Sequence, residues 1–164
     1  MPASRDDLFA FLDSLAITTT TVEHPPLHTV EESRVLRGEI PGGHCKSLFL
    51  KDRKGALWLV VALEDARVDL NRLAKLLGAA RLSFGRPELL DEVLGVTPGS
   101  VTPFALINDR DGRVGVVLDQ AMMAHDPLNY HPLTNEATTT IARDDLLRFI
   151  RACGHVPRIL ALPA

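Results

Sequence analysis

The hydrophobic positions of this chain recur with two different periods, which indicates that it contains both helices and strands. The segment 5–15 has apolar residues at helical spacing, behind a capping box formed by Ser4 and Asp7. The same combination of apolar spacing and end signals predicts further helices at 29–38, 69–78, 87–94 and 143–153, with a short helical piece at 122–123.

Runs rich in β-branched and apolar residues predict the strands. The run 18–24 stops at two prolines, which suits a short strand that ends in a stiff turn. Two longer runs, 46–52 and 56–63, flank a turn-like sequence and predict a hairpin. A second hairpin is predicted for 104–109 and 113–119, and two further strands at 137–142 and 158–162.

The order of these elements predicts the fold class. Because hairpins are mixed with helices, we expect an α/β fold with a mixed, largely antiparallel sheet covered by helices, and not a doubly wound parallel fold. The 164 residues suit one domain that spans 1–164, and the sequence contains no internal repeat and no long linker.

Composition narrows the class of protein. Hydrophobic residues make up 46% of the chain and charged residues 24%, which is typical of globular proteins. No apolar run is long enough to cross a bilayer, and the acidic N-terminal stretch does not fit a signal peptide. We therefore expect a cytoplasmic protein without a membrane partner, in which Cys45 and Cys153 stay unpaired.

The formal net charge of −3 gives the whole molecule no attraction for a polyanion. Any contact with nucleic acid must therefore be local. The best candidate is one stretch whose cations are interleaved with acids: Arg34, Arg37, Lys46, Lys51, Arg53 and Lys54. Charge alone favours a solvated mixed-charge surface for this stretch.

Several common enzyme motifs are absent, including the phosphate-binding and dinucleotide-binding glycine loops, the GxSxG elbow and HExxH. His44–Cys45 and Cys153-x-His155 lack the usual spacing of zinc ligands, so we expect no metal and no cofactor. A buried thiol with a capping or surface histidine is the simpler interpretation. Cys45 activated by His44 remains open as a nucleophile.

Two polar groups lie next to apolar strands. The ammonium of Lys46 should lie at the mouth of the strand that follows it, although a lysine at a strand edge often serves only solubility. The loop from Gly99 to Pro103 offers the backbone N–H groups of Ser100 and Val101 to a carbonyl oxygen or an oxyanion. A plain connecting loop is the alternative.

A third polar group combines His131, Asn135 and a threonine run that includes Thr138. The histidine can orient a substrate or move a proton, and it can equally cap a strand.

Five separated segments together resemble a known family: CKSLFLKD, RLSF, LLDEVLGVTPGSVTPFALIND, VVLD and HPLTNEATT. In this order and spacing they resemble the YbaK-like prolyl-tRNA editing proteins over nearly the whole chain. The stand-alone alanyl-tRNA(Pro) deacylases look most similar.

The resemblance implies a YbaK-like editing-domain fold, no metal and hydrolysis of the ester between a wrong amino acid and tRNA. By position, Lys46 matches the family's essential lysine and His131 the histidine of the HPL motif. Substrate binding is implied for the loop residues Gly99, Ser100, Val101, Thr102 and Pro103, and for Asn135 and Thr138 of the HPL segment. Glu136 departs from the small or neutral residue expected there, which affects the shape or charge of that segment.

The expected reaction is removal of alanine from the acceptor end of mischarged tRNA(Pro), with prolyl-tRNA synthetase as a further candidate partner. Two alternatives stay open. One is a deacylase for Cys-tRNA(Pro) or another misacylated tRNA, since pocket size decides among them. The other is a module that binds tRNA or a synthetase without catalysis.

Overall fold

The computed structural model of this protein describes residues 1–26, 32, 35, 38 and 40–164, so the helix predicted at 29–38 lies largely outside the described residues. The helices are α1 (Arg5–Ser14), α3 (Leu70–Leu77), α4 (Pro87–Leu94) and α5 (Arg143–Ala152), with 3₁₀ turns η1 (Pro98–Ser100), η2 (Pro103–Asn108) and η3 (Met122–Ala124). The strands are β1 (Thr19–Glu23), β2 (Gly43–Asp52), β3 (Leu57–Leu63), β4 (Leu82–Phe84), β5 (Val114–Asp119), β6 (Leu128–Tyr130), β7 (Ala137–Ile141) and β8 (Arg158–Leu160).

Local signals in the sequence explain where the helices begin and end. Ser4 and Asp7 form the predicted reciprocal capping box of α1, with N···O distances of 2.9 and 3.1 Å. The Asp69 carboxylate caps α3, and Gly78 ends it in the left-handed conformation at φ 67°. These helices are confirmed within a residue or two of their predicted bounds.

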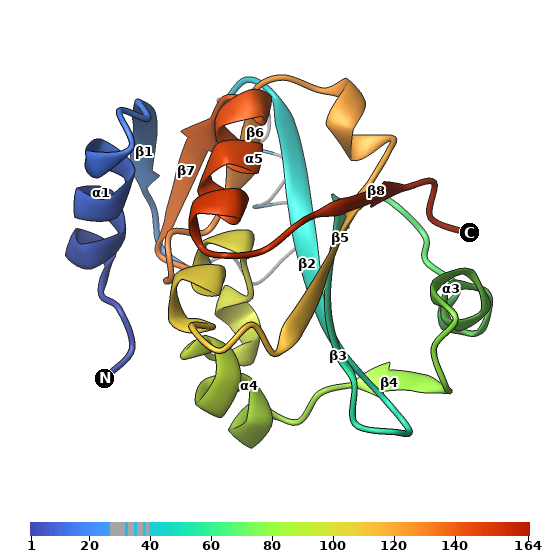
Figure 1. The fold of residues 1–164 in the computed structure, drawn as a ribbon. Coiled ribbons are helices and arrows are strands. Elements are labelled where there is room, and N and C mark those ends of the chain that lie inside the picture. The colour runs from blue at the N-terminus through green and yellow to red at the C-terminus, as the bar shows by residue number, and fades with distance from the viewer. Residues whose placement is uncertain (27–31, 33–34, 36–37, 39) are drawn as a thin grey trace.

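The strands form one sheet in the order β1-β7-β6-β2-β3-β5-β8, with β4 paired to the end of β2 (Figure 1). The pairs β1–β7, β6–β7, β2–β3 and β2–β4 are antiparallel, whereas β2–β6, β3–β5 and β5–β8 are parallel. The predicted mixed α/β sheet is therefore confirmed, as is the hairpin of β2 and β3.

The second predicted hairpin is wrong. The apolar run after Pro103 forms the 3₁₀ segment η2, and β5 pairs in parallel with β3. Thr102 caps η2 by accepting the Phe104 N–H at 3.3 Å, and Pro103 occupies the first helical position, where its missing N–H costs nothing. A short apolar run does not distinguish a buried strand from a buried helical turn, and here capping and tertiary packing decided.

Two short strands, β4 and β6, have no counterpart among the predicted elements. Each has three residues, which is too short for the alternating pattern to be read from sequence. Both are nevertheless important for the architecture, because they pair with opposite ends of β2.

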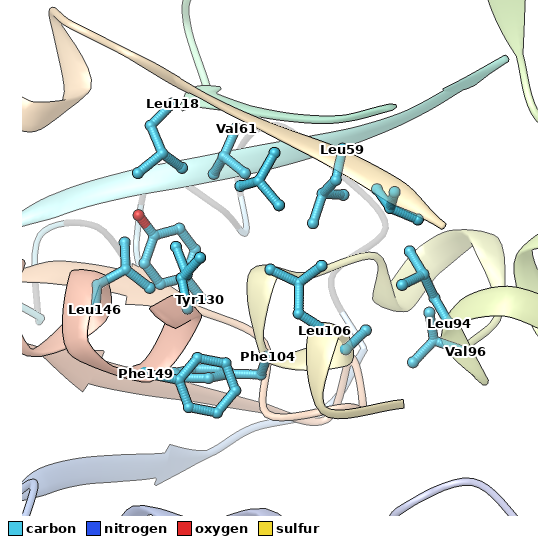
Figure 2. Close-up of a cluster of buried hydrophobic side chains, with 14 of the residues drawn as sticks. Leu59, Val61, Leu94, Val96, Phe104, Leu106, Leu118, Tyr130, Leu146 and Phe149 are labelled. Atoms are coloured by element: carbon cyan, nitrogen blue, oxygen red, sulfur yellow. The ribbon is translucent and has the colours of Figure 1, made fainter. Parts of the chain in front are cut away.

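Apolar side chains are buried on both faces of the sheet. On β2, Phe49 belongs to the larger hydrophobic cluster and Leu50 to a smaller cluster with α3. The larger cluster, shown in Figure 2, contains the rings of Phe104 and Phe149, whose centroids are 5.4 Å apart in an edge-to-face arrangement. This packing fixes η2, and with it the loop that precedes η2, against the sheet.

The described helices are all too short and too polar to cross a membrane.

Candidate functional site

Lys46 lies on β2 opposite Ala62, four residues before the antiparallel pairing with β4 begins at Leu50. Because side chains alternate along a strand, Lys46 faces the same side of the sheet as Leu48. Its ammonium donates a hydrogen bond to the carbonyl oxygen of Ala66, in the turn that follows β3. An ammonium carries three N–H donors, so this bond fixes the charge and leaves donors for a ligand.

The loop before η2 is shaped by its own backbone hydrogen bonds. Gly95 ends α4 in the left-handed conformation at φ 66°, and the Ser100 N–H donates to the Thr97 carbonyl at 2.9 Å. The Ser100 amide is therefore occupied, in contrast to its predicted role as an oxyanion donor. Within the described part of the chain the Val101 N–H has no acceptor, so Val101 is the remaining candidate donor.

Gly99 lies next to the connection between β6 and β7. A Cβ atom placed on Gly99 would be 3.4 Å from the side-chain nitrogen of Asn135. Gly99 itself is exposed, whereas Ser100 and Thr102 are buried. The structure thus brings together the glycine loop and the HPL segment, which are separated by about thirty residues in the sequence.

His131 has one ring nitrogen committed to the backbone. Its Nδ1 is 3.1 Å from the Ala137 carbonyl oxygen, which can only accept, so Nδ1 carries the proton. Burial lowers the pKa of His131, with a smaller opposing effect from this hydrogen bond. Near neutral pH the ring is therefore uncharged, and the lone pair on Nε2 can accept a proton or orient a water molecule. His131 can therefore fill both predicted roles, because Nδ1 binds the strand backbone while Nε2 stays available for chemistry.

His24, which no sequence motif marks, also lies beside the HPL segment. Its Nε2 is 2.8 Å from the Thr138 hydroxyl, and its Nδ1 is 2.9 Å from the Pro25 carbonyl oxygen. By the same argument Nδ1 carries the proton, and in the neutral ring Nε2 accepts from Thr138. Thr138 is buried, so its predicted role in substrate binding would have to act through His24.

Glu64 is a second residue that sequence reasoning missed. The carboxylate acts electrostatically on His131 and on Cys45, raising the pKa of each. The Glu64 N–H donates to the His44 carbonyl at 2.9 Å, beside the start of β2. The Glu64 backbone is therefore fixed to the strand that carries Lys46, and its charge acts weakly on the histidine of the HPL segment. The available signal was an acidic pair, Glu64 and Asp65, directly after an apolar run.

A cavity of about 470 Å³ lies at this end of the sheet. Its lining includes Gly43, His44, Glu64 and Ala66, so the carbonyl that holds Lys46 belongs to a cavity wall. No hydrogen bond or ion pair joins Lys46 directly to the Gly99–Pro103 loop or to His131 among the described residues.

The cysteines do not provide a nucleophile. Burial raises the pKa of the Cys45 thiol to about 12, and its Sγ is 3.5 Å from the Gly43 carbonyl oxygen. The thiol is therefore protonated at neutral pH. Cys45 and Cys153 are both free thiols.

His155, which was considered with Cys153 as a possible zinc ligand, lies in the protein interior. His155, predicted to be a capping or surface residue, is buried with its Nε2 3.3 Å from the Asp109 carboxylate. Across the described residues, no three histidine, cysteine or acidic side chains are arranged to bind a metal ion.

The lowered pKa of His131 predicts a pH dependence of stability. Between the folded-state pKa and about 6.5 the unfolded chain binds more protons, so the free energy of unfolding should fall as the pH drops below about 6.5. It should level off below the folded-state pKa. Urea unfolding of wild type and His131→Gln between about pH 7.5 and 5 measures this contribution as the difference between the two proteins. Parallel pH profiles would contradict the assignment.

Comparisons with known proteins show the family of this chain. The model of the aminoacyl-tRNA editing domain matches residues 24–149, a range that begins at His24 and includes Lys46, the glycine loop and the HPL segment. The chain is 34% identical over 160 residues to the prolyl-tRNA editing protein ProX of Acetoanaerobium sticklandii, covering 97% of this chain and 98% of the relative.

Two other proteins extend the comparison. The prolyl-tRNA synthetase associated domain-containing protein 1 of Bos taurus is 44% identical over 154 residues, covering 91% of this chain and 90% of the relative. A protein crystallised as a candidate trans-editing enzyme for prolyl-tRNA synthetase has the same fold, with a TM-score of 0.76 at 20% identity over 100% of this chain and 99% of that one.

Proposed function

Because the chain belongs to the aminoacyl-tRNA editing domain family, we propose that it is a deacylase that removes alanine from mischarged tRNA(Pro). The observation that carries the proposal is the ammonium of Lys46, anchored on the Ala66 carbonyl, in a chain whose HPL segment holds His131 by an Nδ1 hydrogen bond to the backbone. The names of the relatives, which refer to prolyl-tRNA editing and to prolyl-tRNA synthetase, support tRNA(Pro) as the substrate and the synthetase as a partner.

The proposed reaction needs little covalent chemistry from the protein. Water adds to the ester carbonyl carbon, the bond from that carbon to the ribose oxygen breaks, and the ribose oxygen leaves with a proton. Free alanine and uncharged tRNA are the products. An aminoacyl ester is activated by the neighbouring ribose hydroxyl, so positioning and charge stabilisation are sufficient.

Each residue then has a defined task. The Val101 N–H, and with it the Gly99–Pro103 backbone, holds the carbonyl oxygen as negative charge develops there. Lys46 contacts the ribose-phosphate end through its remaining N–H donors. His131 orients the attacking water through Nε2, while Asn135 borders the loop beside Gly99. No thiol participates, since Cys45 is protonated.

Size selection explains why alanine is the proposed amino acid. A synthetase pocket shaped for proline rejects the smaller alanine weakly, because each missing methylene gives only about 1–3 kcal/mol of discrimination. A second site that admits alanine and excludes the proline ring restores accuracy. Apolar side chains beside the Gly99–Pro103 loop are the candidate lining of such a sieve.

The test is hydrolysis of Ala-tRNA(Pro), Cys-tRNA(Pro) and Pro-tRNA(Pro) by the purified protein. We expect turnover of the alanyl ester, at least about tenfold slower turnover of the cysteinyl ester, and none of the prolyl ester. Preference for the cysteinyl ester would overturn the alanine assignment. Absence of hydrolysis of all three esters, with tRNA bound, would indicate a binding module.

A further inference from the structure

Exposed cations gather where β2 pairs with β4, at the end of β2 remote from β6 (Figure 1). Lys51 is opposite Ser83, and in the next step of the same register the Arg53 N–H donates to the Arg81 carbonyl at 3.0 Å. Arg53 and Arg81 thus flank the end of the β2–β4 pairing, next to Lys51. We call these three exposed cations the basic face.

Among the described residues, the cations of the basic face have no acidic partner. All three residues are exposed, and the ion pairs of the described part of the chain involve other arginines and His155. The interleaved Asp52 is buried, and its carboxylate accepts backbone N–H groups of the β2–β3 turn, at 2.9 Å from Lys54. By sequence alone, Asp52 would neutralise the positive charges next to it. In the fold, its carboxylate instead binds the backbone of the β2–β3 turn.

The arrangement is electrostatically unfavourable in the isolated protein. Arg53 and Arg81 are like charges on backbone segments joined by a hydrogen bond, and neighbouring like charges repel each other. Arg86, exposed nearby, is the N-cap of α4 without a side-chain cap hydrogen bond, so its charge opposes the helix dipole. A polyanion that lies across this surface would relieve both.

We propose that the basic face binds the sugar-phosphate backbone of the tRNA acceptor stem, an inference that rests on the proposed deacylase function. Lys46 and Lys51 are five strand residues apart, or roughly 17 Å. Alternation directs the two side chains to opposite sides of the sheet, so the unpaired nucleotides at the 3′ end of a tRNA would have to pass around the edge strand β4 for the ester to reach Lys46 while the stem contacts the basic face. Because the whole chain has a net charge of −3, it can attract RNA only through a local cluster of cations such as the basic face.

The experiment compares two triple variants with the wild type. The test variant carries Lys51→Gln, Arg53→Gln and Arg81→Gln. The control variant loses the same number of positive charges elsewhere: Arg110→Gln, Arg151→Gln and Arg158→Gln. These three arginines are exposed, lie outside the β2–β4 region and have no ion pair among the described residues. Fluorescence anisotropy gives the Kd for uncharged tRNA(Pro) across a salt series, and hydrolysis of 2′(3′)-O-alanyl-adenosine reports the site without a stem.

We expect the test variant to bind tRNA at least about tenfold more weakly, with a salt slope reduced by about 2–3, while the control changes little. The test variant should keep wild-type hydrolysis of alanyl-adenosine and an unchanged or higher Tm, because like charges have been removed.

Equal losses of affinity in both triple variants, or none in either, would overturn the proposal even if deacylation is confirmed. Loss of binding to prolyl-tRNA synthetase with unchanged tRNA affinity would also overturn it, in favour of an acidic protein partner. If wild type hydrolyses no alanyl ester while tRNA affinity still depends on the basic face, the deacylase function fails instead.

Discussion

Replacing Lys46 with alanine is expected to lower kcat/KM for Ala-tRNA(Pro) hydrolysis by at least about 100-fold, the usual cost of losing one preorganised electrostatic contact. The ammonium is held by the Ala66 carbonyl at the cavity wall, so it is positioned before the substrate arrives. Water in the vacated space would replace the charge poorly, because it is not fixed. Single-turnover deacylation under excess enzyme measures the chemical step.

Two controls separate this role from structural effects. Lys75→Ala removes an exposed lysine from α3 and should leave the rate unchanged. Cys45→Ala removes the protonated thiol beside Lys46 and should retain activity, since the thiol has no chemical role. If Lys46→Ala deacylates at the wild-type rate with an unchanged Tm, the assignment of Lys46 fails. A strong loss in Cys45→Ala would reopen thiol catalysis.

Replacing Phe104 with alanine should lower the free energy of unfolding by about 3–5 kcal/mol, because a fully buried ring is lost and a cavity remains. Phe104 makes edge-to-face contacts with Tyr130 at 6.0 Å and with Phe149 at 5.4 Å between centroids, so its removal also costs two ring interactions. Urea unfolding at constant pH measures the change.

Phe84→Ala is the matched control for this loss, since the Phe84 ring is 63% exposed and its truncation creates no buried cavity. We expect a change within about 0.5 kcal/mol for Phe84→Ala. Because Phe104 directly follows Pro103, Phe104→Ala should also slow deacylation at temperatures where the protein is still folded. Equal stabilities of the two variants would contradict the packing described for η2.

Structural features that depend on residues close together in the sequence were predicted correctly, whereas features that depend on distant residues were not. Helices α1 and α3 were predicted because Ser4 and Asp69 cap them from adjacent positions. The run 104–109 was misassigned as a strand because its apolar residues pack as a helical turn against α5, a contact that no local pattern contains. Its partner strand β5 was found, but its parallel pairing was not.

The candidate site shows the same division. Lys46, the Gly99 loop and His131 were selected through the resemblance to an editing family, and the match of the aminoacyl-tRNA editing domain confirms that family. His24 was missed because neither residue type nor spacing marks it, and Glu64 because an acidic pair after an apolar run is a weak signal. Their place beside the HPL segment arises from the pairing of β1 with β7 and from the end of β3.

The helix ends, the β2–β3 hairpin, the α/β class and the family could be predicted from the chain alone, because caps, turns and motif order are properties of residues close together in the sequence. The parallel pairings, the protonation of buried groups and the cations without an acidic partner among the described residues became known only from the fold. Those properties depend on burial and on residues brought together from distant segments, as when β4 places Arg81 opposite Arg53. Function at this site depends on both, since local patterns supply the chemical groups and the fold sets their distances and protonation.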